Sequence, residues 1–164
     1  MIMARSIFTS FHYDSDAARV QQVLKIGAIT NDSLVTAQEW ESVQRQTDAA
    51  IEKWIHEQML RKSAVVVLVG RETASSRWVD YEIRKAWDDR RPLVGIRIHG
   101  LKNLEGETST RGSNPFANVK LANNGGTLDR HIILHDPAGS DSKAVYKTIA
   151  DNIETWVAGA KKRS

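Results

Sequence analysis

Six consecutive apolar residues, Ala64–Val69, run without a polar or charged side chain and end at Gly70. Such a run is typical of a β-strand that is covered on both faces, as strands are in a parallel sheet. Parallel strands need long crossover connections, which helices usually supply. This segment therefore favours a fold in which strands and helices alternate.

The remaining patterns alternate in the same way along the chain. Strands are predicted where β-branched and aromatic residues gather, over residues 5–11, 92–99 and 130–135. Helices are predicted where apolar residues recur at helical spacing, over residues 16–25, 43–61, 75–89 and 142–158. We therefore predict an α/β, flavodoxin-like three-layer sandwich, with a central parallel five-stranded sheet and helices on both faces.

Two long segments, residues 26–40 and Gly100–Asp129, lack a clean period and are predicted to be loops. Loops longer than about 15 residues in a compact domain usually serve a function or are disordered. The second segment could be a lid, a wall that shapes the product, an assembly surface or ordered decoration. Ligands of open α/β sheets bind beyond the carboxyl ends of the strands, which directs attention to residues 12–16 and 70–78.

The composition excludes several functional classes. The chain has no cysteine, which excludes disulfides, thiolate catalysis and cysteine zinc sites. Lys and Arg number 23 against 20 for Asp and Glu, and residues 161–163 supply the excess. The remaining body is neutral, so neither nucleic acid nor a membrane is an expected partner. We predict one cytoplasmic domain over residues 1–160 and a solvated basic tail over residues 161–164.

Other familiar sites are missing from the sequence. It contains no glycine-rich phosphate loop and no nucleophile elbow, which disfavours Rossmann oxidoreductases, P-loop enzymes and serine hydrolases. His131 and His135 are predicted on one face of a strand, but two histidines without a clear third ligand make a weak metal site. No metal or bound cofactor is therefore predicted. Three tryptophans lie at core spacing on predicted helices and are assigned to packing: Trp54, Trp87 and Trp156.

Several motifs at the strand ends resemble TIR domains. Val66–Gly70 followed by Ser76-x-Trp78-x-x-x-Glu82 resembles a TIR strand and the helix start after it, and Ile7–Phe11 resembles the opening strand. The finer match is to a prokaryotic TIR-like family, the one that contains the TIR protein of Thoeris antiphage systems. It covers about residues 4–135 and is carried by Ser10–Tyr13, Trp40, Thr47–Ile55, Trp78–Ile83 and Gly112–Phe116.

The sequence departs from the TIR pattern at two positions. Val79 stands where many TIR domains carry cysteine, and Gly70 stands where many carry serine. The long loop around residues 114–116 replaces the compact hairpins of animal TIR adaptors, so an adaptor-like partner surface is not expected. Asp14 and Asp16 follow the first strand and are interpreted as helix-capping groups.

The resemblance implies an enzyme that breaks the bond between nicotinamide and ribose in NAD. As an NAD glycohydrolase or ADP-ribosyl cyclase, it would make a cyclic ADP-ribose-type signal on phage infection, and this diffusible nucleotide would activate a separate effector. NAD would then be the substrate and not a cofactor. A homo-oligomer is compatible with this activity. The alternative is a non-catalytic TIR-like module that signals by self-association, since a fold does not determine function.

That reaction needs a carboxylate near the anomeric carbon, where it stabilises an oxocarbenium-like transition state and holds the ribose hydroxyls. The resemblance points to Glu82, one helical turn after Trp78 and near the expected switch point of the sheet. The alternative is a surface glutamate that pairs with Arg77, Lys85 or Arg90.

The flat rings of NAD also need an aromatic slot. Five residues are candidates for binding the substrate: Phe11, His12, Tyr13, Trp40 and Trp78. Alternative roles remain open for four of them. Phe11 could be a core residue, His12 and Tyr13 could be exposed turn residues, and Trp40 could anchor its loop on the core.

Overall fold

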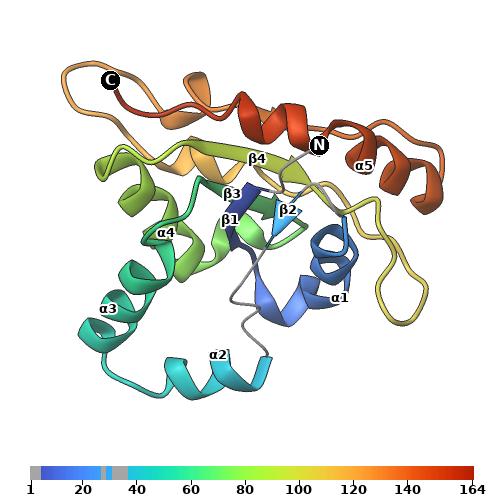
Figure 1. Cartoon of the computed structure of the whole chain (residues 1–164), viewed down its shortest axis with the longest axis horizontal. Helices are drawn as coiled ribbons and strands as arrows, with labels where there is room; N and C mark the ends of the chain where they lie inside the picture. The colour runs from blue at the N-terminus through green and yellow to red at the C-terminus, as the bar shows by residue number, and fades with distance from the viewer. Residues whose placement is uncertain (1–4, 27–28, 31–36) are drawn as a thin grey trace.

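The computed structural model describes residues 5–26, 29–30 and 37–164, with only the backbone of residues 5, 29–30 and 37–39. Five strands form one parallel sheet in the order β2–β1–β3–β4–β5 (Figure 1). The strands are β1 (Arg5–Ser10), β2 (Ile29–Thr30), β3 (Ala64–Val69), β4 (Leu93–Arg97) and β5 (Leu134–His135). The predicted fold class is confirmed.

Helices join and cover these strands. The α-helices are α1 (Tyr13–Leu24), α2 (Ala37–Gln44), α3 (Asp48–Met59), α4 (Arg77–Asp88) and α5 (Ser142–Ala158). Three short 3-10 helices lie in the connections: η1 (Thr73–Ser75), η2 (Pro115–Asn118) and η3 (Leu128–Arg130).

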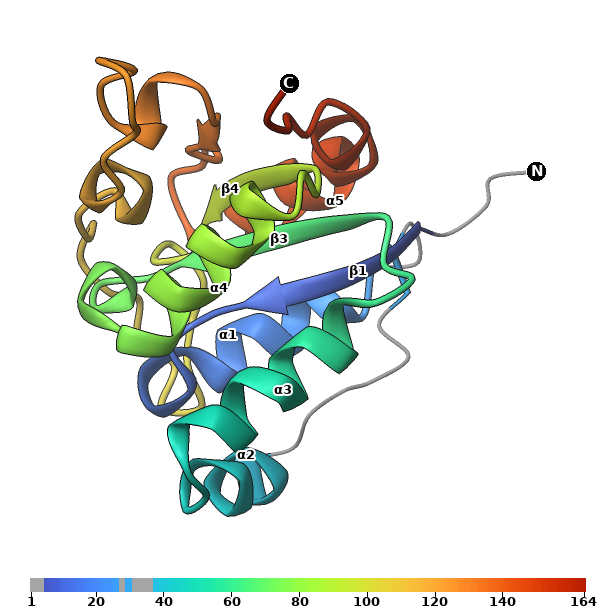
Figure 2. The same ribbon diagram turned by 90° about the vertical axis from the view of Figure 1, so that its left-hand side faces the viewer.

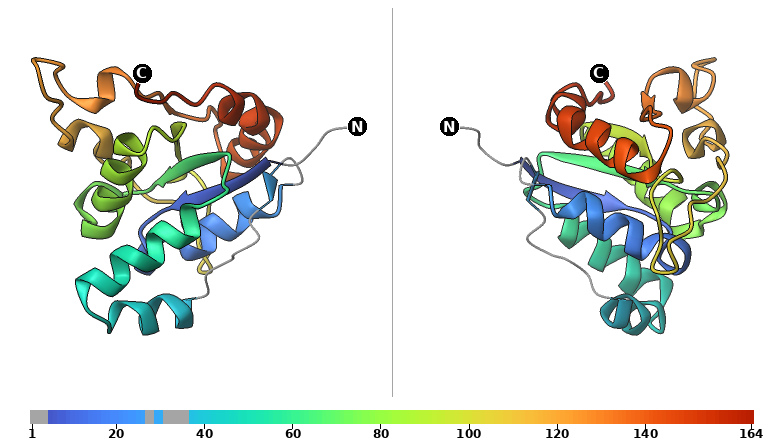
Figure 3. Two further views of the ribbon diagram at one scale, coloured as in Figure 1. Left: turned by 60° about the vertical axis from the view of Figure 1, so that its left-hand side comes forward. Right: turned by 90° about the vertical axis from the view of Figure 1, so that its right-hand side faces the viewer.

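The central strand β3 separates two hydrophobic layers, because successive side chains of a strand point to opposite faces. Val65, Val67 and Val69 pack in one cluster with α3 and α4, which lie nearest the viewer in Figure 2. Ala64, Val66 and Leu68 pack in the other cluster with α1 and α5, which lie together on the opposite face (Figure 3, right). β3 is therefore covered on both faces, as its apolar run predicts.

Local capping signals start three of the helices. The side chain of Ser76 accepts a hydrogen bond from the Val79 N–H at the start of α4. Asp141 does the same for Ala144 at the start of α5, and Thr47 for Ala50 at the start of α3. The predicted helix over residues 142–158 agrees with α5 at both ends, and the one predicted over residues 75–89 agrees with α4 to within two residues.

The predicted start of the first helix is wrong. α1 begins at Tyr13, and His12 occupies the cap position without a side-chain capping hydrogen bond. Asp14 and Asp16 lie inside the first turn and do not cap the helix. Asp16 is instead buried and accepts a hydrogen bond at 3.2 Å from Nη1 of Arg19. Oδ1 of this carboxylate is therefore engaged in a buried ion pair within α1.

The segments predicted as a loop over residues 26–40 and a single helix over residues 43–61 are also corrected. The described residues of the first include β2 at the sheet edge and the start of α2, while residues 27–28 and 31–36 lie outside the described part. The second is divided, since α2 ends at Gln44 and α3 begins after its cap, Thr47.

The strand predicted over residues 130–135 is reduced to Leu134–His135. η3 occupies residues 128–130, and the His131 N–H donates to the Leu128 carbonyl at 2.9 Å to close it. The predicted loop over residues 100–129 is built partly of η2 and η3 and contributes Phe116 and Leu128 to the α3/α4 layer.

The composition predicts a solvated basic tail, but part of this tail contacts the rest of the domain. Lys161 and Leu93 exchange two backbone hydrogen bonds, at 2.8 and 3.0 Å, and Arg163 lies 3.6 Å from Asp88. Within the described ranges, no helix has both the length and the apolar character needed to cross a membrane.

Candidate active site

A cavity of about 910 Å³ lies at the carboxyl end of β1. The chain leaves β1 toward β2 on one side and continues with β3 on the other, so this is the point where the strand order reverses. The cavity walls come from the end of β1, from α1 to α4, and from the turn after β4. All six residues singled out in the sequence line it: Phe11, His12, Tyr13, Trp40, Trp78 and Glu82.

Glu82 is buried on the second turn of α4, with 6% of its surface exposed. The hydroxyl of Ser10, the last residue of β1, donates a hydrogen bond to Oε1 of Glu82 at 2.7 Å. Burial raises the pKa of Glu82 to about 8, and the Ser10 hydrogen bond partly opposes that rise. Sequence reasoning missed Ser10 as a partner, because a serine at a strand end has no distinctive pattern.

The alternative role of Glu82 as a surface ion-pair residue is wrong. Two of its proposed basic partners pair elsewhere, Arg77 with Asp48 and Lys85 with Asp89 at 2.9 Å. The carboxyl group of Glu82 instead points toward β1 and the cavity.

Four aromatic rings follow one another along the cavity wall. Phe11 stacks on Tyr13 with ring centroids 4.5 Å apart, and Tyr13 stacks on Trp40 at 5.9 Å. Trp40 in turn contacts Trp54 at 5.9 Å, with the rings tilted by 45°. Trp54, expected only in packing, therefore also belongs to the wall. Its helical spacing explains the core contact but does not show that one edge of the ring faces a cavity.

The alternative roles considered for these residues agree with the structure for Phe11 and Trp40, but not for His12 and Tyr13. Phe11 packs against the α1/α5 core as well as lining the cavity, and Trp40 packs against the α3/α4 core. His12 and Tyr13 are half-buried and not exposed turn residues.

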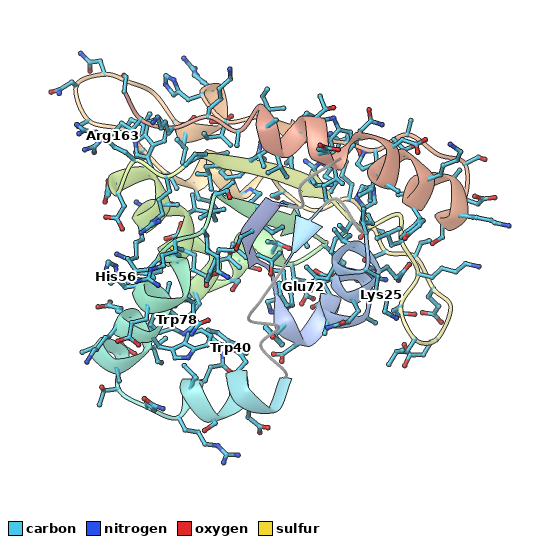
Figure 4. The ribbon with its side chains drawn as sticks, in the orientation of Figure 1. Lys25, Trp40, His56, Glu72, Trp78 and Arg163 are labelled. Atoms are coloured by element: carbon cyan, nitrogen blue, oxygen red, sulfur yellow. The ribbon has the colours of Figure 1, made fainter. Side chains whose placement is uncertain are left out.

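Trp78 lines the cavity from the first turn of α4. Its ring meets Tyr81 edge-on at 5.6 Å, and the Arg77 guanidinium lies 4.7 Å above it. Figure 4 shows the Trp78 and Trp40 side chains near one another, and both line the same cavity. The wall thus combines flat apolar surfaces on two sides with one buried carboxyl group.

A buried ion pair supports the rim of the cavity. Arg19 donates from Nε to the Leu101 carbonyl at 2.8 Å and from Nη2 to the Glu107 carbonyl at 2.9 Å. The same guanidinium contacts Asp16, so the turn after β4 is attached to α1. This turn supplies Lys102–Leu104 to the cavity rim.

Both departures from the TIR pattern have a structural reason. A Cβ atom on Gly70 would lie 2.1 Å from Oδ2 of Asp16, so the buried carboxylate occupies the space that a serine would need. Val79 is 1% exposed and packs between α4 and α3 in the core. Neither Gly70 nor Val79 is among the residues that line the cavity.

The two histidines near the end of the sheet lie apart. His131 follows η3 and tilts against Trp87 at 6.0 Å, whereas His135 in β5 stacks on Trp156 at 4.4 Å. The expectation that they share a strand face is therefore wrong. Within the part of the chain that the structure describes, no three or more His, Cys, Asp or Glu side chains gather as metal ligands would. Trp87 and Trp156 pack against the two cores, as predicted.

A parallel sheet in this order, with helices on both faces and a buried glutamate on the helix after β3, is consistent with a TIR-like domain. The model of the family described as "Thoeris protein ThsB, TIR-like domain" matches residues 8–103, and the chain belongs to this family. The matched region contains Glu82 and the predicted substrate-binding residues.

A curated relative from Bacillus cereus (strain MSX-D12) agrees with this assignment. It is named "Putative cyclic ADP-D-ribose synthase ThsB1" and is 31% identical over 120 residues. The match covers 70% of this chain and 62% of the relative, so the chain spans about three fifths of that protein's length.

Proposed function

We propose that this chain cleaves the N-glycosidic bond of NAD and converts the remaining ADP-ribosyl group into a cyclic ADP-ribose-type signal. The single observation that carries the proposal is the buried Glu82 carboxyl group, held by Ser10 beside an aromatic wall at the switch point of the sheet. Family membership and the name of the Bacillus relative support it. In a Thoeris system the nucleotide would act in antiphage defence by reaching a separate effector.

The residues present suit the chemistry of this bond. The C1′–N bond breaks with its electron pair going to the pyridinium ring, so nicotinamide leaves neutral and needs no general acid. Positive charge then develops at C1′ of the ribose. A Glu82 carboxylate beside C1′ stabilises that charge strongly, because the surrounding cavity has a low dielectric constant.

The raised pKa of Glu82 connects substrate binding to proton release. With a pKa of about 8, the carboxyl group of the free protein is mostly protonated at neutral pH. The cationic nicotinamide ring favours the ionised carboxylate, since an opposite charge nearby lowers the pKa. Binding of NAD therefore expels the proton and creates the charged form that catalysis requires.

The aromatic wall selects the substrate and controls what captures the ribosyl group. The rings of Tyr13, Trp40 and Trp78 offer flat surfaces on which nicotinamide or adenine can stack. At about 910 Å³, the cavity is at the upper end of the range for small-molecule sites. Both halves of one dinucleotide can then share it, which favours ring closure over hydrolysis.

The test is nicotinamide release from NAD by the purified chain at low and high protein concentration. Glu82→Gln keeps the shape of the side chain and should reduce release by at least about 100-fold. Glu57→Gln, at an exposed position on α3, is the matched control. The product is identified by mass, because a cyclic product weighs one water less than linear ADP-ribose.

Full turnover by Glu82→Gln would overturn the assignment of the carboxylate. No release from the unaltered chain at either concentration, together with persistent self-association, would instead support the non-catalytic module.

A further inference from the structure

Three polar side chains form a hydrogen-bonded chain, and one of them, His12, lines the cavity. Nδ1 of His12 lies 2.7 Å from Oγ of Ser15, and Oγ of Ser15 lies 2.9 Å from Oε2 of Glu72. His12 and Ser15 lie at the start of α1, whereas Glu72 follows β3 on the neighbouring connection. Figure 4 shows Glu72 beside the first turn of α1. None of the roles assigned above explains this arrangement.

The hydrogen-bond directions follow from the donors available. A carboxylate accepts hydrogen bonds and donates none, so the Ser15 hydroxyl must donate its only proton to Glu72. The Ser15 oxygen then accepts from His12, and this requires a proton on Nδ1. The neutral imidazole therefore carries no proton on Nε2.

The position of His12 places this ring in the same cavity as Glu82. His12 follows Ser10 by two residues, and Ser10 holds the Glu82 carboxyl group. Among the described residues, none forms a hydrogen bond with Nε2 of His12.

We propose that Glu72 and Ser15 hold His12 in the Nδ1–H tautomer, so that its bare Nε2 accepts the proton of the hydroxyl that captures the ribosyl group. This proposal rests on the proposed function and extends it to the second half of the reaction. His12 is then a catalytic residue, and Ser15 and Glu72 are positioning residues.

The step balances as a proton transfer coupled to substitution at C1′. The O–H bond of water or of a ribose hydroxyl breaks, and its proton moves to Nε2. The oxygen forms a bond to C1′, while the electron pair of the C1′–N bond departs with neutral nicotinamide. The imidazolium later returns the Nε2 proton to solvent. A dinucleotide hydroxyl gives a cyclic product and water gives linear ADP-ribose.

The tautomer is tested without any turnover. Nitrogen-15 NMR of the imidazole in the whole chain, at a pH where His12 is neutral, should show the Nδ1–H form. In Ser15→Ala and Glu72→Gln the population should shift toward the Nε2–H form. A predominant Nε2–H form in the unaltered chain would overturn the relay, whether or not the protein cleaves NAD.

Kinetics test the chemical role. His12→Ala should lower turnover by about 100-fold or more, and added imidazole should restore part of it. Ser15→Ala and Glu72→Gln should each lose about tenfold, and the double variant no more than Ser15→Ala alone. Ser63→Ala and Glu57→Gln, both at exposed positions outside the cavity, are the controls.

The outcomes separate this proposal from the proposed function. Full activity of His12→Ala, with activity lost in Glu82→Gln, would overturn the role of His12 alone. A chain that releases no nicotinamide in any form would overturn the proposed function and the role of His12 as a proton acceptor, while the NMR result would still decide the tautomer.

Discussion

Ser10 Oγ and Glu82 Oε1 lie 2.7 Å apart, although 72 positions separate the two residues in the sequence. Removal of this hydroxyl in Ser10→Ala should raise the pKa of Glu82 further, because the hydrogen bond favours the carboxylate. We expect the midpoint of the pH profile of kcat/KM for nicotinamide release to move to higher pH, with about a tenfold loss at neutral pH. An unchanged midpoint, equal to that of the control Ser63→Ala, would contradict this role.

Glu82 should also make stability depend on pH. Its pKa is about 8 in the folded state against 4.5 unfolded, so the folded chain binds the extra proton between these values. Stability is then lost as pH rises through that window, by about 1.4 kcal/mol per pH unit. Glu82→Gln has no such titration and does not lose this stability. Its free energy of unfolding, relative to that of the unaltered chain, should therefore increase by about 2–3 kcal/mol from pH 6 to pH 8.

Urea unfolding of both proteins at several pH values measures this difference. Parallel pH curves for the two proteins would show that Glu82 titrates as an ordinary exposed carboxylate. Glu57→Gln, at an exposed position, should follow the unaltered chain throughout.

Trp40 joins the Tyr13 and Trp54 rings in the cavity wall, at centroid distances of 5.9 Å on each side. Trp40→Ala should raise KM for NAD by several-fold to about tenfold, because a stacked aromatic pair contributes about 0.5–1.5 kcal/mol. Steady-state kinetics below the melting temperature measures the effect. Trp156→Ala removes a ring stacked on His135 outside the cavity and should leave KM unchanged. Equal KM values for the two variants would argue against substrate stacking on this wall.

The Asp16–Arg19 pair should contribute to stability far more than a surface ion pair. Burial raises the pKa of Asp16, and the Arg19 guanidinium is the main group that opposes this rise. Arg19→Ala leaves the carboxyl group buried without its partner and frees two loop carbonyls, so we expect a loss of about 3–5 kcal/mol. Arg45→Ala breaks the exposed pair with Glu41 and should cost about 0.5 kcal/mol or less. Urea unfolding measures both free energies of unfolding. Equal losses for Arg19→Ala and Arg45→Ala would show that the buried pair contributes no more stability than the exposed one.

Elements with strong local signals agree with the sequence predictions. The apolar run of β3 and the spacing of Val145, Ile149 and Ile153 in α5 specify their own burial, because one period alone places them on the core. Ser76 and Asp141 cap their helices through neighbours three residues away, so these ends are also predictable. The resemblance to TIR-like domains rests on residues within these same elements.

Long-range contacts explain the predictions that fail. Asp16 is buried and does not cap α1, because it pairs with an Arg19 side chain that is held by the Leu101 and Glu107 carbonyls after β4. The final strand is short because its pairing with β4 involves only Leu134 and His135. No local period contains either fact, since each depends on a partner from another element.

The sequence by itself determined the alternating α/β order, the apolar faces of the main helices and the family to which the chain belongs. Only the tertiary structure decided that Glu82 is buried rather than exposed, that Ser10 holds it, and that Trp54 joins the cavity wall. The reason is physical: hydrophobic periodicity is a local property of the chain. The protonation and orientation of a polar group depend on the dielectric surroundings and on hydrogen-bond partners that folding brings together.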